Sequence, residues 1–255
     1  NLMIITKTPL RISLIGGGSD LPSFYKFNSY GSVVNCTIDK FLYVTLKKQN
    51  ELFEEKFRLN YYITEHVNSI DEIQNPVIRE CFKEMKVDDF LYIGTIADAP
   101  SSTGLGSSSA FCVGLLKALF EYRNEKVSNE KLAELAADIE INKLGLSLGK
   151  QDHYSAVFGG LNYFKFNSDE NVNINKLDFN NKAFNDIKKN MIIFWTGVQR
   201  SAENILKDQS SNYKTNNDKL IDLRKSSDSF YLSMKNNEES KKINYGELLH
   251  NSWKL

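Results

Sequence analysis

Short apolar runs alternate with turn residues through the first part of the chain, which is the pattern of β-strands. Strands are predicted where Val, Ile, Phe, Tyr and Thr recur, namely at Met3–Thr6, Pro9–Ile15, Ser32–Asp39, Phe41–Leu46, Phe57–Thr64 and Phe90–Ala97. Pro76–Met85 has the apolar spacing of a helix, and its proline stands in the first turn, where it is tolerated.

Helical spacing dominates the later part of the chain. Helices are predicted at Phe111–Tyr122, Asn129–Leu144, Ser201–Ser211, Lys219–Lys235 and Tyr245–Leu255, and strands at Gly159–Phe166 and Met191–Thr196. An Asn- and Lys-rich stretch at 167–190 separates the two parts. We therefore predict two domains, residues 1–166 and residues 167–255.

The charge balance narrows the classes of partner. The 32 Lys and Arg residues equal the 32 Asp and Glu residues, and the composition is that of an ordinary globular protein. A surface without excess cations does not favour nucleic acid or anionic membranes, so neither is expected as a partner. No run reaches the roughly 18 apolar residues of a membrane span, and no signal peptide is recognised, so a cytoplasmic location is expected.

The cysteines and histidines indicate no metal or disulfide framework. Cys36, Cys81 and Cys112 are odd in number and far apart, and the three histidines are scattered. We expect reduced and mostly buried thiols.

The most unusual stretch is Pro100-Ser-Ser-Thr-Gly-Leu-Gly-Ser-Ser-Ser-Ala110, which leads into a predicted helix. Glycines let the backbone approach a ligand closely, and a helix N-terminus offers free N–H groups that suit a phosphate. The stretch lacks the Gly-Lys-Ser/Thr ending of a Walker A loop. The alternative is a small-residue loop that only packs tightly.

This loop resembles the phosphate loop of the GHMP small-molecule kinases, a family that includes galactokinase, homoserine kinase and mevalonate kinase. Two more segments resemble that family in its own order, Pro9–Pro22 with its Gly-Gly-Gly-Ser-Asp run and Gly149–Gly160 with its Gly-Lys-Gln-Asp run. The amino-acid sequences of these segments are similar to those of the bacterial D-glycero-α-D-manno-heptose 7-phosphate kinases.

The resemblance implies ATP and Mg²⁺ as cofactors. It assigns the ATP phosphates to Gly104, Leu105, Gly106, Ser107, Ser108 and Ser109. It assigns Mg²⁺ to Ser108 and Glu140, and without it Glu140 would be interpreted as a solvated surface residue.

The resemblance also implies two catalytic residues. Asp152 would accept the proton of the attacking hydroxyl or polarise that hydroxyl, and the alternative is a turn aspartate. Arg11 would hold Asp152 ionised and offset charge in the transition state. An arginine buried in an apolar strand needs a partner, and Asp152 would be a natural one. The alternative for Arg11 is an edge-strand side chain that faces water.

Substrate binding is assigned by resemblance to Gly17, Gly18, Asp20 and Arg200. Asp20 would accept hydrogen bonds from sugar hydroxyls, or else only cap the residues that follow it. Arg200 would hold a substrate phosphate with its bidentate fork, or else form a structural ion pair. Lys150 and His153 are near Asp152 in sequence, and they could contribute to a substrate-phosphate pocket or simply be exposed.

The activity implied is phosphorylation of the anomeric hydroxyl of D-glycero-α-D-manno-heptose 7-phosphate to the 1,7-bisphosphate, which serves GDP-heptose and surface polysaccharide synthesis. The partner is then a small sugar phosphate. The alternatives are another GHMP sugar kinase of the fucose or galactose type, or a non-catalytic sugar or nucleotide sensor. The presence of Arg11, Glu140 and Asp152 together disfavours the sensor.

The fold implied is the α+β fold of the GHMP kinases, with a mixed sheet and helices mainly on one face. Its N-terminal domain would be of the ribosomal protein S5 domain 2-like type and its C-terminal domain ferredoxin-like. Such kinases carry a third glycine-rich motif, which is not recognised after Thr196-Gly197. We therefore expect a truncated C-terminal domain, whose uncovered core a homodimer could cover.

Overall fold

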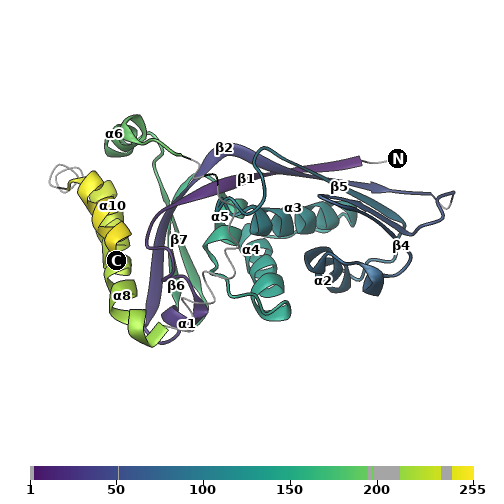
Figure 1. Ribbon diagram of the computed structural model, residues 1–255, viewed down its shortest axis with the longest axis horizontal. Coiled ribbons are helices and arrows are strands. Elements are labelled where there is room, and N and C mark those ends of the chain that lie inside the picture. Colours follow the sequence, from purple (N-terminus) through teal and green to yellow (C-terminus); the bar gives the residue numbers. More distant parts are fainter. Residues whose placement is uncertain (1–2, 51, 195–196, 198–212, 237–242) are drawn as a thin grey trace.

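The computed structural model describes residues 3–50, 52–194, 197, 213–236 and 243–255. One sheet runs through most of this part of the chain (Figure 1). Its strands are β1 (Met3–Ile15), β2 (Tyr30–Lys48), β3 (Phe57–Asn60), β4 (Thr64–Val67), β5 (Leu91–Ala97), β6 (Leu161–Asn167) and β7 (Val172–Leu177). Their order is β4-β3-β5-β2-β6-β7, and β1 pairs with β2.

The long strand β2 joins the two halves of the sheet. On one side it pairs with β1, from Met3 opposite Lys47 to Ile15 opposite Val34. On its other side, residues 42–48 pair with β5 and residues 30–36 pair with β6. β3 and β5 are parallel and the other described pairs are antiparallel, so the sheet is mixed, as predicted.

Helices complete the predicted α+β class. They are α1 (Pro22–Tyr25), η1 (Ile70–Glu72), α2 (Pro76–Glu84), α3 (Ser107–Tyr122), α4 (Asn129–Ala137), the π-helix η2 (Asp138–Lys143), α5 (Gln151–Phe158), α6 (Lys182–Asn190), α8 (Tyr213–Lys235) and α10 (Tyr245–Lys254). None of the described helices has the length and apolar character needed to cross a bilayer.

Helix α3 forms the centre of the larger core. Its residues Leu115 and Leu116 are fully buried, in one cluster with Val44 and Leu46 of β2. Gly114 permits this close approach, because a Cβ atom there would lie 2.9 Å from the Thr8 hydroxyl. The burial holds the start of α3 in a fixed place beside β1.

The sheet is covered on both faces around β6. Val33 and Phe164 are buried in one cluster with Tyr154 of α5, whereas Val34 belongs to a cluster with Phe230 of α8. Neighbouring residues of a strand point to opposite faces, so Val33 and Val34 serve different cores. The prediction of helices mainly on one face therefore holds only for the β3–β5 half. β7 pairs with β6, so this sheet continues past the domain boundary predicted after Phe166, and that boundary stays a prediction.

Five strand predictions were wrong in their boundaries. Met3–Thr6 and Pro9–Ile15 are parts of β1, because an edge strand accommodates a proline that lacks the N–H donor. The predicted strands at 32–39 and 41–46 are likewise both parts of β2. Phe57–Thr64 is divided instead between β3 and β4, because a turn closes with the Tyr61 N–H donating to the Ile63 carbonyl.

Other predicted elements also differ from the structure. Residues 191–194 are not a strand, and the rest of the strand predicted at 191–196 lies outside the described residues, as does the helix predicted at 201–211. The helix predicted at 129–144 changes at Asp138 into the π-helix η2. Helices α5 and α6 were not predicted. The predicted burial of Cys36, Cys81 and Cys112 is confirmed, and all three are free thiols.

Candidate active site

The loop between β5 and α3 presents an uncapped helix N-terminus. Gly104 and Gly106 have φ angles of 75° and 74°, in the left-handed region that glycine adopts readily. Gly106 is the residue before the first turn of α3, and no side chain caps this end. The N–H groups of the first turn therefore point toward the loop, with the positive end of the helix dipole behind them. All six residues predicted to bind the ATP phosphates lie here.

Arg11 joins this loop to helix α5. Its Nη1 donates to the Gly104 carbonyl at 2.7 Å, and its backbone N–H donates to the Leu105 carbonyl at 3.0 Å. A Cβ atom on Gly106 would lie 3.3 Å from the Arg11 Cγ, so glycine leaves room for the arginine. The side chain of Arg11 thus lies along the phosphate loop.

The other edge of the Arg11 guanidinium donates hydrogen bonds to Asp152. Nε donates to Oδ1 at 2.7 Å and Nη2 donates to Oδ2 at 2.6 Å, which is the bidentate arrangement. The Arg11 side chain is 11% exposed and the Asp152 side chain 22%. The predicted pairing is therefore present, and Arg11 does not face water. Asp152 is a helical residue near the N-terminus of α5, so the alternative of an aspartate in a loop turn is wrong. Its side chain remains partly accessible to a small molecule.

Glu140 is fully buried and not a surface residue. Its Oε1 accepts from the Ser108 hydroxyl at 2.5 Å, and its Oε2 accepts from the Ser109 hydroxyl at 2.7 Å. His153 Nε2 lies 2.7 Å from the same Oε2. Burial alone would raise the pKa of Glu140, but the hydrogen bonds from His153, Ser108 and Ser109 outweigh it and lower the pKa.

A divalent cation fits the donor set at Ser108 and Glu140. Both supply oxygen atoms, which Mg²⁺ prefers, and the two atoms already lie 2.5 Å apart. The described residues contain no group of three or more His, Cys, Asp and Glu side chains suited to a metal. Mg²⁺ typically takes one or two carboxylates together with substrate phosphates, so one carboxylate beside a phosphate loop suffices.

Asp20 holds the start of α5. Its Oδ2 accepts from the Gln151 N–H at 3.1 Å, and its Oδ1 accepts from the Gly18 N–H at 3.0 Å. A Cβ atom on Gly149 would lie 1.8 Å from the Asp20 carboxylate. Burial and the nearby charge of Asp152 raise the pKa of Asp20.

The loop that contains Gly18 and Asp20 therefore packs against the start of α5. Asp20 is 1% exposed and Gly18 is buried, whereas Gly17 is partly exposed. The alternative that Asp20 caps the next residues is wrong, because the N-cap of α1 is Leu21 and no side chain caps that helix. Contact of Asp20 with a sugar stays a prediction. Arg200 lies outside the described residues.

Glu170, which the sequence analysis missed, gathers two lysines beside α5. It pairs with Lys150 and, at 2.5 Å, with Lys26, and it accepts a hydrogen bond from the Tyr25 hydroxyl at 2.7 Å. Burial alone would raise its pKa, but the hydrogen bonds from Lys150, Lys26 and Tyr25 lower the pKa to about 2. The positive charge of Lys150 is therefore balanced by a carboxylate of the same chain. No local sequence signal connects Glu170 with the Gly-Lys-Gln-Asp run.

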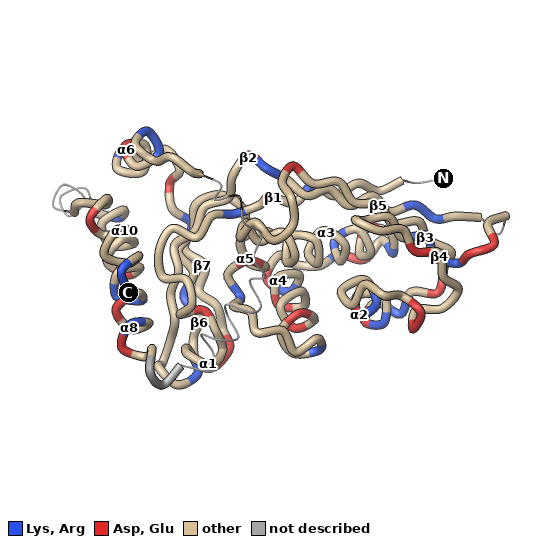
Figure 2. Tube along the Cα trace, viewed as in Figure 1, with Lys and Arg blue, Asp and Glu red and all other residues tan. Residues whose placement is uncertain are grey.

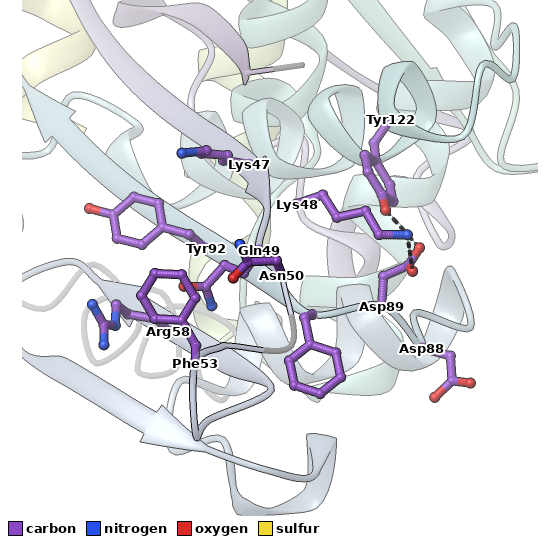
Figure 3. Close-up of a pocket in the computed structure, with 11 residues that line it drawn as sticks. Lys47, Lys48, Gln49, Asn50, Phe53, Arg58, Asp88, Asp89, Tyr92 and Tyr122 are labelled. Atoms are coloured by element: carbon purple, nitrogen blue, oxygen red, sulfur yellow. Dashed lines mark hydrogen bonds and ion pairs between the residues drawn. The ribbon is translucent and has the colours of Figure 1, made fainter. Parts of the chain in front are cut away.

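A large cavity lies at the other end of α3. Its volume is about 1110 Å³, and its lining includes Lys48, Asp89 and Tyr122 (Figure 3). Asp89 accepts from Lys48 and from Tyr122, each at 2.6 Å. Tyr122 ends the helix that Ser107 begins, so about 22 Å of helix separates this cavity from the phosphate loop. This cavity therefore lies apart from the candidate site.

Charge is spread over the described chain. Lys and Arg positions are interspersed with Asp and Glu positions on the helices and strands (Figure 2). The guanidinium of Arg11 lies beside the loop before α3, where it is paired with the Asp152 carboxylate.

Comparisons with known proteins show similarity to the GHMP kinases. Residues 72–160 match the family model described as the GHMP kinases N terminal domain. The chain is 31% identical over 214 residues to a D-glycero-α-D-manno-heptose 7-phosphate kinase of Campylobacter jejuni, covering 79% of this chain and 62% of that relative. It is 26% identical over 212 residues to a galactokinase of Pyrococcus furiosus, covering 77% of this chain and 54% of that relative.

A solved structure extends the similarity to the described fold. It is titled a D-glycero-D-manno-heptose 1-phosphate kinase from Bacteroides thetaiotaomicron, and it superposes with a TM-score of 0.80 at 25% identity. The superposition covers 99% of this chain and 78% of that one. The predicted α+β fold of the GHMP kinases is confirmed, and the chain spans less than two thirds of the length of the two curated relatives.

The Glu170 cluster predicts a specific acid sensitivity. Because the pKa of Glu170 falls from 4.5 to about 2 on folding, the ionised group stabilises the fold above pH 4.5. That stabilisation is lost as the pH falls from 4.5 toward 2. Glu170→Gln lacks it, so its free energy of unfolding should fall less steeply with decreasing pH over this range than that of the wild type.

Urea unfolding at a series of pH values measures this slope. Glu121→Gln, at an exposed position of α3, is the matched control and should keep the wild-type slope. Identical slopes for wild type and Glu170→Gln would contradict the role given to the cluster.

Proposed function

We propose that this chain, which carries the N-terminal domain of the GHMP kinases, is an ATP-dependent kinase that phosphorylates the anomeric hydroxyl of a heptose phosphate. The observation that supports this most directly is the position of Arg11. One guanidinium contacts the phosphate loop at Gly104 and the carboxylate of Asp152. A kinase needs a phosphate site and a group for the attacking hydroxyl side by side.

The ATP phosphates would lie at the start of α3. The N–H groups of Ser107, Ser108 and Ser109 face the loop without a capping side chain. Such an end binds phosphate through direct hydrogen bonds and through the helix dipole. The left-handed glycines keep side chains away from the path of the phosphates.

Ser108 and Glu140 would hold Mg²⁺ beside those phosphates. The ion would neutralise charge on the phosphate oxygens when it is bound. Glu140 can bind this ion because its hydrogen bonds lower the pKa of the buried carboxylate and so favour the ionised form.

Asp152 and Arg11 would act on the acceptor. Asp152 would accept the proton of the sugar hydroxyl as that oxygen bonds to the γ-phosphorus and the bond to ADP breaks. Arg11 fixes the orientation of this carboxylate through its two hydrogen bonds. Its contact with the Gly104 carbonyl places the same positive charge near the transferred group.

The heptose 7-phosphate specificity rests on similarity. Of the two heptose kinases compared, one is named for a 7-phosphate substrate and the other for a 1-phosphate. Gly17, Gly18 and Asp20 would contact the sugar, and Arg200 would hold its phosphate. The product would then be the 1,7-bisphosphate.

A substrate panel tests this proposal. ADP release should require D-glycero-α-D-manno-heptose 7-phosphate, with at least tenfold lower kcat/KM for L-fucose, galactose and the heptose 1-phosphate. Turnover only with another sugar would overturn the substrate while sparing the kinase. Tight binding of ATP without turnover of any sugar would contradict the enzyme and favour the sensor.

Replacing the proposed base separates chemistry from binding. Asp152→Asn should lower kcat by about 10²- to 10⁴-fold, since it removes the proton acceptor while keeping the shape. The affinity for a non-hydrolysable ATP analogue, measured by calorimetry, should change by less than about threefold. Asp186→Asn, at an exposed position of α6, is the control and should keep full turnover. Retained turnover in Asp152→Asn would remove Asp152 from the mechanism.

A further inference from the structure

We propose that His153 is a positioning residue for Glu140: it fixes one carboxylate oxygen so that the other is presented to a divalent cation at the phosphate loop. This inference rests on the proposed function, because it concerns the cation that accompanies ATP. It gives a role to a histidine that was first considered for a substrate-phosphate pocket.

The contact between the two residues is fully enclosed. Both side chains are 0% exposed, and the Nε2 atom of His153 lies 2.7 Å from Oε2 of Glu140. A carboxylate only accepts hydrogen bonds, so Nε2 must carry the proton. His153 therefore cannot line a substrate-phosphate pocket, because its ring is enclosed and this donor is taken by Glu140.

The two oxygens of Glu140 have different surroundings. Oε2 accepts from two buried groups, the Ser109 hydroxyl and the His153 ring. Oε1 accepts from Ser108, whose side chain is exposed at the loop. Only Oε1 therefore lies on the side from which a cation would arrive. Without His153, the carboxylate could turn about its last bond and lose this direction.

The hydrogen bond between His153 and Glu140 also connects two helical segments. His153 follows Asp152 in the first turn of α5, whereas Glu140 lies in the π-helix η2. One hydrogen bond thus links the helix of the proposed base with the residue proposed to bind the cation. Single π-turns occur often at functional sites, and here the π-turn carries Glu140.

A purely structural role would make a different prediction. Removing one member of a buried pair leaves the other without its partner, so a purely structural role predicts lower thermal stability on substitution. Groups that orient metal ligands instead alter metal affinity by about ten- to a hundredfold when they are replaced. Metal affinity therefore distinguishes positioning from stability.

Three substitutions of His153 test the proposal in the full chain. In His153→Gln the amide nitrogen reaches the place of Nε2 and can donate to Glu140. In His153→Asn the amide nitrogen stands near the place of Nδ1 and falls short. His153→Leu removes the donor. Ser155→Ala is the matched control, because this buried α5 hydroxyl donates to the Gln151 carbonyl, its one hydrogen bond among the described residues.

Mn²⁺ binding to each protein with the β,γ-imido analogue of ATP is measured by electron paramagnetic resonance, alongside thermal unfolding. The Asn and Leu variants should bind Mn²⁺ at least about tenfold more weakly than the wild type. The Gln and Ser155→Ala variants should stay within about threefold. Binding of the nucleotide analogue without metal should be unchanged in all of them.

Mn²⁺ affinity equal to wild type in His153→Asn would overturn the proposal, as would equal loss in the Gln and Asn variants. The Gln–Asn comparison decides the matter even if the Leu variant does not fold. Failure of the unmodified protein to bind Mn²⁺ with the nucleotide would contradict the proposed function itself. That outcome is visible before any variant is compared, so the two failures are distinguishable.

Discussion

The arrangement of the site depends on the guanidinium of Arg11. It holds the Gly104 carbonyl on one side and both carboxylate oxygens of Asp152 on the other. An arginine that is 11% exposed needs such partners, because an unpaired charge in that place would be strongly unfavourable. The loop and helix α5 are thus held at a fixed separation. The bulge in β1 beside Arg11 adjusts the strand at this point.

Two buried carboxylates also help to fix the starts of helices α3 and α5. Asp20 binds the first N–H of α5, and Glu140 binds both the start of α3 and the ring of His153. Their pKa values move in opposite directions, because backbone donors do not outweigh the burial of Asp20, whereas three side-chain donors outweigh the burial of Glu140. The charged carboxylate is therefore favoured at the proposed cation site.

The sequence predicted the contact between Arg11 and Asp152 but not most of the other contacts around it. Glycine and serine spacing located the loop, the family resemblance located Asp152, and the need of a buried arginine for a partner predicted its pairing with Arg11. Glu170 could not be found in this way, because only the turn after β6 brings it beside Lys150. Strand lengths were wrong for a related reason. β1 accommodates Pro9 at a sheet edge, and the length of β2 depends on strands that are distant in sequence.

The most direct measurement is a crystal structure of the chain with D-glycero-α-D-manno-heptose 7-phosphate and a non-hydrolysable ATP analogue. The account predicts the anomeric oxygen within about 2.6–3.2 Å of the Asp152 carboxylate. It also predicts the β- and γ-phosphates at the N–H groups that begin α3, with Arg11 between the two ligands. A sugar phosphate bound away from Asp152, or phosphates bound away from the start of α3, would contradict it.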